Sequence, residues 1–159
     1  MSDFEQSYLG QLRQLVGNRR LISPAVRAVI QDQEGRVLFI QRSDNGRWAL
    51  PAGSMELHES VLDSLKREVK EETGLTVLEA TLIAIYSEPR FHFTNAFGGE
   101  HQMLAFVFRV DKWEGEVCKS TDETVDASFF ALDGLPYISE VHKETLEDLV
   151  AYNGQVILK

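Results

Sequence analysis

The stretch that decides the fold runs from Gly53 to Leu75 and reads GSMELHESVLDSLKREVKEETGL. Ser60, with Asp63 three residues later, predicts the start of a helix, because the two side chains can satisfy backbone amides of the first turn. Gly74 predicts the end of this helix, since glycine readily adopts the left-handed conformation that closes a helix. The stretch therefore predicts a helix over about Val61 to Thr73.

This helix has two faces of opposite character. The apolar residues, which should pack on a core, are Val61, Leu65 and Val69. Glu68, Glu71 and Glu72 lie off that face at spacings of three and four, so they share one side. Like charges at this spacing cost a helix roughly 0.2 to 0.5 kcal/mol per pair, and the last turn of a helix favours cations. Such a cluster is typical of a divalent cation site, because Mg²⁺ prefers carboxylate oxygens. The alternative is a solvated acidic face.

Further fixed positions surround the glutamates. Five residues separate Gly53 from Glu59, seven separate Glu59 from Arg67, and Gly74 with Leu75 closes the pattern. This combination should arise by chance in a chain of this length on the order of once in a million. The bracketing residues therefore favour the cation site over the solvated face.

The whole pattern resembles the Nudix box of the Nudix hydrolases, enzymes that cleave a nucleoside diphosphate linked to another group. Residues 48–53, WALPAG, resemble the family's lead-in to the box, with Ala52 in place of a glycine. Residues 129–136, FFALDGLP, resemble its last strand and turn. The resemblance covers roughly residues 24–136. It implies an α+β protein, a Nudix-type α/β/α sandwich with a mixed central sheet.

The resemblance also implies roles for the residues of the box. Glu68 and Glu72 are the expected direct ligands of Mg²⁺, for which Mn²⁺ could substitute. The carbonyl of Ala52 or Gly53 is expected to complete the shell, and Glu71 is expected to be a ligand or a neighbour of one.

Three further residues are expected to support the box. Glu59 and Arg67 should form an ion pair that holds the loop against the helix, and Gly74 should end that helix.

A further carboxylate from outside the box is usual in the family. The candidates are Glu88, Glu100, Asp122 and Glu123. We favour Glu123, which lies in a polar loop ahead of the last predicted strand, although an ordinary exposed loop acid is the alternative. The catalytic set is thus Glu68, Glu71, Glu72 and Glu123, and either Glu68 or Glu123 could be the general base.

Candidate substrate contacts lie outside the box. Arg42 ends a predicted strand close to the box loop, and Arg27 and Arg47 are weaker candidates for meeting a phosphate. Phe91 and Phe93, in the aromatic and glycine-rich segment 90–99, could stack a base or ribose. The alternative is that these rings cover the sheet. The four histidines lack metal-ligand spacing and have no assigned role.

Composition limits the other possibilities. The 159 residues, 43% hydrophobic and 26% charged, predict a single domain over 1–159. A net charge of −9 argues against a nucleic-acid partner, which needs a basic surface, but allows a small-molecule nucleotide. No membrane span or signal peptide is evident, and Cys118 has no partner for an internal disulfide. We therefore expect a cytoplasmic protein.

The remaining pattern predicts the elements around the box. Apolar residues at helical spacing predict a helix over residues 2–16, within an N-terminal extension of residues 1–20. It either packs on its own domain or helps to build a homodimer interface or a lid. Strands are expected at 25–31 and 36–41, joined as a hairpin, and at 76–87, 102–110 and 126–132. A last helix is expected over about 138–152.

The sequence thus predicts a Mg²⁺-dependent hydrolase that cleaves the pyrophosphate bond of ADP-ribose, another nucleotide sugar or a nucleoside triphosphate. The alternative is a non-catalytic module that binds a nucleotide without cleaving it. Degenerate modules should lose box glutamates, and none is missing here.

Overall fold

The computed structural model describes residues 3–159. Its helices are α1 (Asp3–Gln6), α2 (Tyr8–Val16), α3 (Val61–Thr73) and α4 (Glu140–Ala151). Its strands are β1 (Leu21–Ile30), β2 (Val37–Arg42), β3 (Trp48–Ala49), β4 (Ala52–Ser54), β5 (Thr76–Tyr86), β6 (His92–Thr94), β7 (Glu100–Glu114), β8 (Thr124–Phe130) and β9 (Ile157–Leu158).

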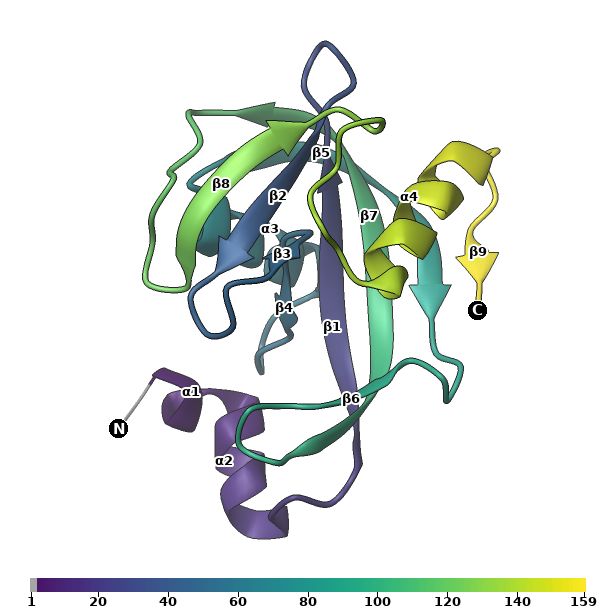
Figure 1. The fold of residues 1–159 in the computed structure, drawn as a ribbon. Coiled ribbons are helices and arrows are strands. Elements are labelled where there is room, and N and C mark those ends of the chain that lie inside the picture. The colour runs from purple at the N-terminus through teal and green to yellow at the C-terminus, as the bar shows by residue number, and fades with distance from the viewer. Residues whose placement is uncertain (1–2) are drawn as a thin grey trace.

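The strands form two sheets (Figure 1). The larger has the order β4-β1-β7-β5-β9, with β6 paired to β7, and the smaller has the order β3-β2-β8. The larger sheet is mixed, because β1 runs parallel to β7 while β5 runs antiparallel to it. The structure therefore confirms an α+β fold with a mixed sheet and helices at the N-terminus.

The predicted hairpin of residues 25–31 and 36–41 is wrong. β1 pairs with β4 and β7, whereas β2 pairs with β3 and β8. Only one bridge, between Gln31 and Val37, joins the two segments. The intervening turn does form, with Asp32 Oδ1 accepting hydrogen bonds from the amides of Glu34 and Arg36. It carries the chain from one sheet to the other.

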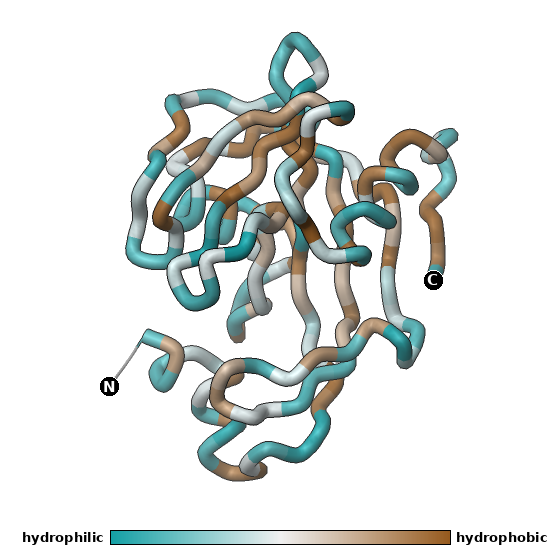
Figure 2. Tube along the Cα trace, viewed as in Figure 1, coloured by the Kyte–Doolittle hydropathy of each residue, from teal (hydrophilic) through white to brown (hydrophobic). Residues whose placement is uncertain are grey.

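The hydrophobic core has two parts, one beneath α3 and one beneath α4, and its apolar residues follow the strands (Figure 2). β1 supplies both parts, because side chains alternate along a strand. Val26, Ala28 and Ile30 belong to the part containing the α3 residues, and Val29 belongs to the part containing the α4 residue Leu146. By the same alternation Arg27 lies on the α4 side of β1.

Helix α3 begins and ends where the sequence predicts. Ser60 Oγ accepts the amide of Asp63 and the Asp63 carboxylate accepts the amide of Ser60, so the capping box is complete. Gly74 adopts φ 78° and closes the helix. A side chain at Gly74 would also meet the side chain of Cys118. These local signals place Glu68, Glu71 and Glu72 on a helix of defined length.

The N-terminal segment forms two helices instead of one. Ser7 interrupts the predicted helix and caps α2, its Oγ accepting the amide of Gly10 at 3.0 Å. The start of the predicted helix, at residue 2, lies outside the described residues. The amide of Tyr8 donates to Glu56 Oε2 at 2.8 Å, so α2 contacts the loop that follows β4 in its own chain. A role in a homodimer or a lid stays a prediction.

Within residues 3–159, no helix combines the length and the apolar character needed to cross a membrane.

Candidate metal centre

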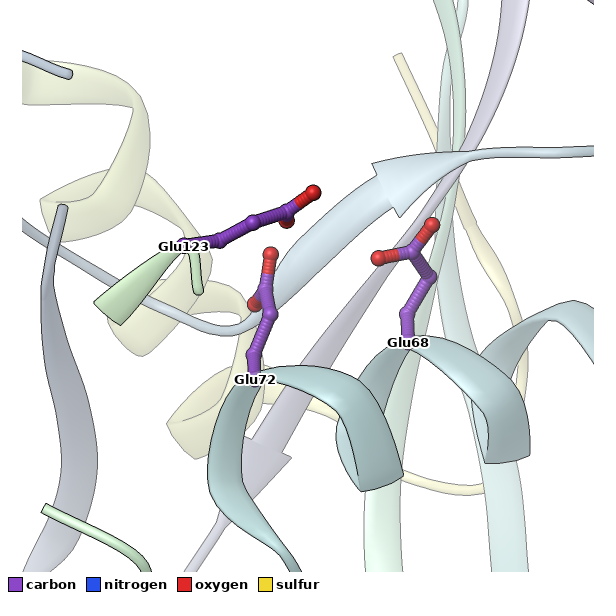
Figure 3. Close-up of side chains that lie close together, drawn as sticks. All are labelled: Glu68, Glu72 and Glu123. Carbon is purple, nitrogen blue, oxygen red and sulfur yellow. The ribbon is translucent and has the colours of Figure 1, made fainter. Parts of the chain in front are cut away.

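Three glutamate side chains converge beside the C-terminal half of α3 (Figure 3). Glu68, Glu72 and Glu123 each offer a carboxylate oxygen, and these oxygens lie within 4.8 Å of one another. Glu68 and Glu72 project from neighbouring turns of α3, while Glu123 reaches them from the loop that precedes β8. Residues 51 positions apart in the chain thus share one site.

Backbone contacts hold the Glu123 loop against α3. The amide of Ser43 donates to the carbonyl of Glu123 at 3.0 Å. Next to it, the buried Thr124 hydroxyl donates to the carbonyl of Glu72 at 3.1 Å. The loop acid is therefore anchored to the helix that carries the other two carboxylates.

Two of the three carboxylates are buried. Glu68 is 7% exposed and Glu72 is 3% exposed. Burial raises the pKa of Glu68 to about 7, and burial with the nearby charge of Glu68 raises the pKa of Glu72 well above its ordinary value. Glu72 Oε2 accepts the amide of Ala52 at 3.0 Å. A cation between these carboxylates would offset the cost of burying them, and hard divalent ions fit an all-oxygen donor set.

The glycine of the box is required by close packing. A Cβ atom at Gly53 would overlap the carboxyl group of Glu68. Gly53 pairs with Val26, and Ala52 pairs with Arg27, which fixes β4 against β1. The backbone of β4 can therefore lie directly against the carboxylate cluster. Metal binding by the carbonyl of Ala52 or Gly53 stays a prediction.

Arg67 connects the box loop to the helix. Its Nε and Nη2 donate to the two carboxylate oxygens of Glu59, and Nη2 also donates to the carbonyl of Ser54. Its Nη1 donates to Glu68 at 2.8 Å and to Glu71 at 3.1 Å. These hydrogen bonds raise the pKa of Arg67 and, at the other end, lower the pKa of Glu59. The contacts match the expected ion pair between loop and helix.

Several other acids stay outside the cluster. The side chain of Glu71 is 51% exposed and contacts Arg67. Glu88 and Glu100 pair with Arg90 and Arg20. Of the loop acids considered from the sequence, the structure brings Glu123 to the two buried glutamates.

The candidate substrate-binding arginines have very different surroundings. Arg42 forms a two-point pair with Asp44, with distances of 2.9 and 2.8 Å. That pair raises its pKa, as do the charges of Glu72 and Glu123. Arg27 is buried and Arg47 is exposed. Arg42 is therefore near the carboxylates but already paired.

The two candidate phenylalanines also differ. Phe91 is 7% exposed and stacks on Tyr86 with ring centroids 4.7 Å apart. It thus covers the sheet, the alternative that the sequence left open. Phe93 is 45% exposed and stacks on His101 at 4.5 Å. Its contact with a base or ribose stays a prediction.

Sequence reasoning left one residue near the site without a role. Among residues 3–159, the Nδ1 atom of His142 is buried without a hydrogen-bond partner. His142 precedes Thr145 by three residues on α4, a spacing that places both on one helix face. That spacing was visible in the sequence, but the orphaned atom was not.

The pKa values in the metal centre predict how stability depends on pH. Without metal, the protein should lose stability as pH rises from about 4.5 to about 7, because folded Glu68 holds its proton up to about pH 7 whereas the ordinary pKa is 4.5. The full loss from this group is on the order of 3 kcal/mol. Thermal unfolding in EDTA at several pH values measures it, and Mg²⁺ should oppose the loss.

Glu68→Gln provides the control for this prediction. Glutamine cannot titrate, so the variant should show a flatter pH profile in EDTA than the wild-type protein. Equal slopes for the two proteins would contradict the assignment of the effect to Glu68.

Comparison with known proteins identifies the family of this chain. The family model of the NUDIX domain matches residues 21–149. ADP-ribose pyrophosphatase from Methanocaldococcus jannaschii is 32% identical over 150 residues, covering 89% of this chain and 82% of that protein. The 8-oxo-dGDP phosphatase NUDT18 from Danio rerio is 34% identical over 117 residues, covering 71% of this chain and 32% of that protein. A MutT NUDIX hydrolase structure from Burkholderia pseudomallei has a TM-score of 0.66 at 27% identity, covering 82% of this chain and 98% of that one.

The fold and the acidic cluster therefore define the class of enzymes that hydrolyse pyrophosphate bonds. The chain belongs to the NUDIX family and is a Nudix hydrolase.

Proposed function

We propose that this enzyme uses Mg²⁺ to cleave the pyrophosphate bond of a nucleoside diphosphate linked to another group. The candidate substrates are ADP-ribose, another nucleotide sugar and a nucleoside triphosphate. The observation that carries the proposal is the convergence of two buried glutamates of α3 with Glu123. Arg67 pairs with Glu68, and a metal bound to a diphosphate would supply the remaining positive charge.

The residues present suit this metal. Glu68, Glu72 and Glu123 would hold it, together with the carbonyl of Ala52 or Gly53, and Glu71 would lie in an outer position. Bound Mg²⁺ would neutralise phosphate charge and lower the pKa of the attacking water. Arg67 would keep Glu68 oriented, because it contacts Glu68 and is itself held by Glu59.

Glu123 is our candidate for the general base. It is exposed to solvent and its carboxylate reaches the cluster from the opposite side to α3. Glu68 is the less suitable candidate, since it is buried and hydrogen-bonded to Arg67. A water molecule activated by Glu123 would approach the phosphorus from the solvent side.

ADP-ribose is the first substrate to test. The similarity to the ADP-ribose pyrophosphatase from M. jannaschii supports it, since that similarity extends over most of both chains. Oxidised guanine nucleotides are the second choice, supported by the similarity to NUDT18. For either nucleotide, Arg42 would release Asp44 and bind a phosphate instead. Phe93 would contact the base or ribose.

A hydrolysis screen tests the proposal. The purified protein is incubated with ADP-ribose, UDP-glucose, a dinucleoside polyphosphate, nucleoside triphosphates and 8-oxo-dGDP, each with Mg²⁺, Mn²⁺ or EDTA. We expect turnover of at least one compound with metal and none with EDTA, and product identification shows which bond breaks. Tight binding without turnover of any compound would favour the non-catalytic nucleotide-binding module instead.

A further inference from the structure

Arg27 is a buried cation that forms no ion pair with an acid among residues 3–159. It is 7% exposed, and its Nε atom has no hydrogen-bond partner. Its Nη1 donates to the hydroxyl of Thr145 at 3.2 Å, and its guanidinium carbon lies 5.8 Å from the centroid of the Tyr86 ring. Among residues 3–159 it is the only buried lysine or arginine. Burying an unpaired charge is unfavourable. A bound anion that compensates the guanidinium would explain why an arginine occupies this buried position.

Two acids of α4 close to Thr145 in sequence, Glu144 and Asp148, are engaged with other groups. Asp148 accepts hydrogen bonds from the Tyr86 hydroxyl and from Lys159 Nζ. Glu144 forms ion pairs with Arg90 at 2.7 Å and with Lys159 at 2.9 Å. Neither carboxylate contacts Arg27. Within residues 3–159 Arg27 therefore forms no ion pair. Burial lowers the pKa of Arg27, and the nearby charges of Tyr86 and Glu144 offset only part of this.

His142 adds a second orphaned polar atom to the same place. It shares a face of α4 with Thr145, and its Nδ1 is buried without a partner. Burial, together with the charges of Arg27 and Arg42, lowers the pKa of His142 to about 3. The ring is therefore neutral near pH 7, and one of its nitrogens can donate a hydrogen bond.

This pair of groups lies beside the metal centre. Arg27 is paired across the strands with Ala52, whose amide donates to Glu72. Arg42 connects the two regions. Its charge lowers the pKa of His142, and the charges of Glu72 and Glu123 raise the pKa of Arg42. An anion held by the metal at one end could therefore extend towards Arg27 at the other.

We propose that Arg27, His142 and Thr145 form an oxyanion subsite that binds a phosphoryl group of the substrate beside the metal centre. The proposal rests on the proposed function, and it adds that the phosphate not held by metal is bound between β1 and α4. Arg27 keeps its hydrogen bond to Thr145 and donates its free Nε–H to a phosphoryl oxygen. Neutral His142 serves as the second donor.

The test separates ligand binding from folding. In Arg27→Met, a flexible apolar chain of similar length replaces the buried charge. We expect the free variant to unfold at the same or a higher temperature than the wild-type protein. We also expect its affinity for inorganic pyrophosphate in Mg²⁺ buffer, measured by calorimetry, to fall at least tenfold. Arg27→Lys should recover part of that affinity because it restores the charge.

Two controls sharpen the result. Arg19→Met removes one exposed arginine and makes the same change in net charge, and it should leave pyrophosphate affinity unchanged. Adenosine, which has no phosphoryl group, should bind equally well or equally poorly to wild-type protein and Arg27→Met. If Arg27→Met weakened adenosine binding as much as pyrophosphate binding, the assignment to phosphoryl oxygens would be wrong.

The proposal would also be overturned if Arg27→Met lowered the unfolding temperature and left pyrophosphate affinity intact, since Arg27 would then be a packing residue. Failure to bind pyrophosphate in the wild-type protein would overturn it as well. None of these measurements requires hydrolysis. A protein that bound pyrophosphate through Arg27 but cleaved no compound in the screen would retain the subsite and lose the proposed function.

Discussion

Replacing Glu72 by glutamine should lower kcat by several orders of magnitude and leave the fold intact. Glutamine has the same shape and can still accept the amide of Ala52, so the contact between α3 and β4 survives. It lacks the negative charge that a divalent cation requires, and a metal-dependent reaction then loses both charge neutralisation and water activation. Steady-state kinetics on the compound identified by the screen, with unfolding curves of both proteins, measure the effect.

Two other substitutions define what this result means. Glu147→Gln alters an exposed glutamate on α4 and should leave kcat unchanged. Glu71→Gln should reduce kcat by less than Glu72→Gln, because Glu71 is half exposed and lies outside the cluster. If Glu72→Gln retained wild-type turnover, the metal centre would have to lie elsewhere. Equal losses for Glu71→Gln and Glu72→Gln would contradict the proposal that Glu72 binds the metal directly and Glu71 does not.

Gly53→Ala should reduce kcat/KM by about 100-fold, although it adds only a methyl group. The new carbon would overlap the carboxyl group of Glu68. That carboxyl group is buried and hydrogen-bonded to Arg67, so either it or β4 must shift. A displacement of about 1 Å at a catalytic centre commonly costs on the order of 100-fold in rate. Kinetics at saturating Mg²⁺ and a Mg²⁺ titration would show how much of the loss is weaker metal binding.

Gly134→Ala is the matched control for this substitution. Gly134 is exposed, and a Cβ there would make an ordinary contact at 3.9 Å with the carbonyl of Ala131. We expect its kcat/KM to stay within about twofold of wild type, since surface substitutions of this kind perturb little. A similar loss in both variants would show that the effect of Gly53→Ala is not specific to Glu68.

Features encoded by neighbouring residues were predictable. The limits of α3 follow from Ser60, Asp63 and Gly74, because capping depends on residues within one turn of the helix end. The shared side of Glu68 and Glu72 follows from helical periodicity. The choice of Glu123 depended instead on the family resemblance, since no local signal links it to residues some 50 positions earlier.

Features that depend on distant partners were not predictable. The separation of β1 from β2 into different sheets depends on β7, which pairs with β1 from more than 70 positions away. The sequence does not specify which partner Arg42 or Phe91 contacts. In the structure Arg42 pairs with Asp44, and Phe91 is buried against Tyr86. From the sequence, Arg27 was a strand residue and a weaker candidate for meeting a phosphate. That Arg27 forms no ion pair within residues 3–159 is seen only in the structure, where α4 lies over it.

The contact between α2 and the box loop connects the region matched by the family model to a helix outside that region. The amide of Tyr8 donates to the Glu56 carboxylate, the amide of Glu56 donates to Glu59, and Glu59 holds Arg67, which in turn contacts Glu68. A chain shortened to residues 21–149 would keep every box glutamate. It would lack α2 and therefore lose the hydrogen bond from Tyr8 to Glu56. The orientation of Glu68, a proposed metal ligand, is thus coupled to a helix that carries none of the proposed catalytic residues.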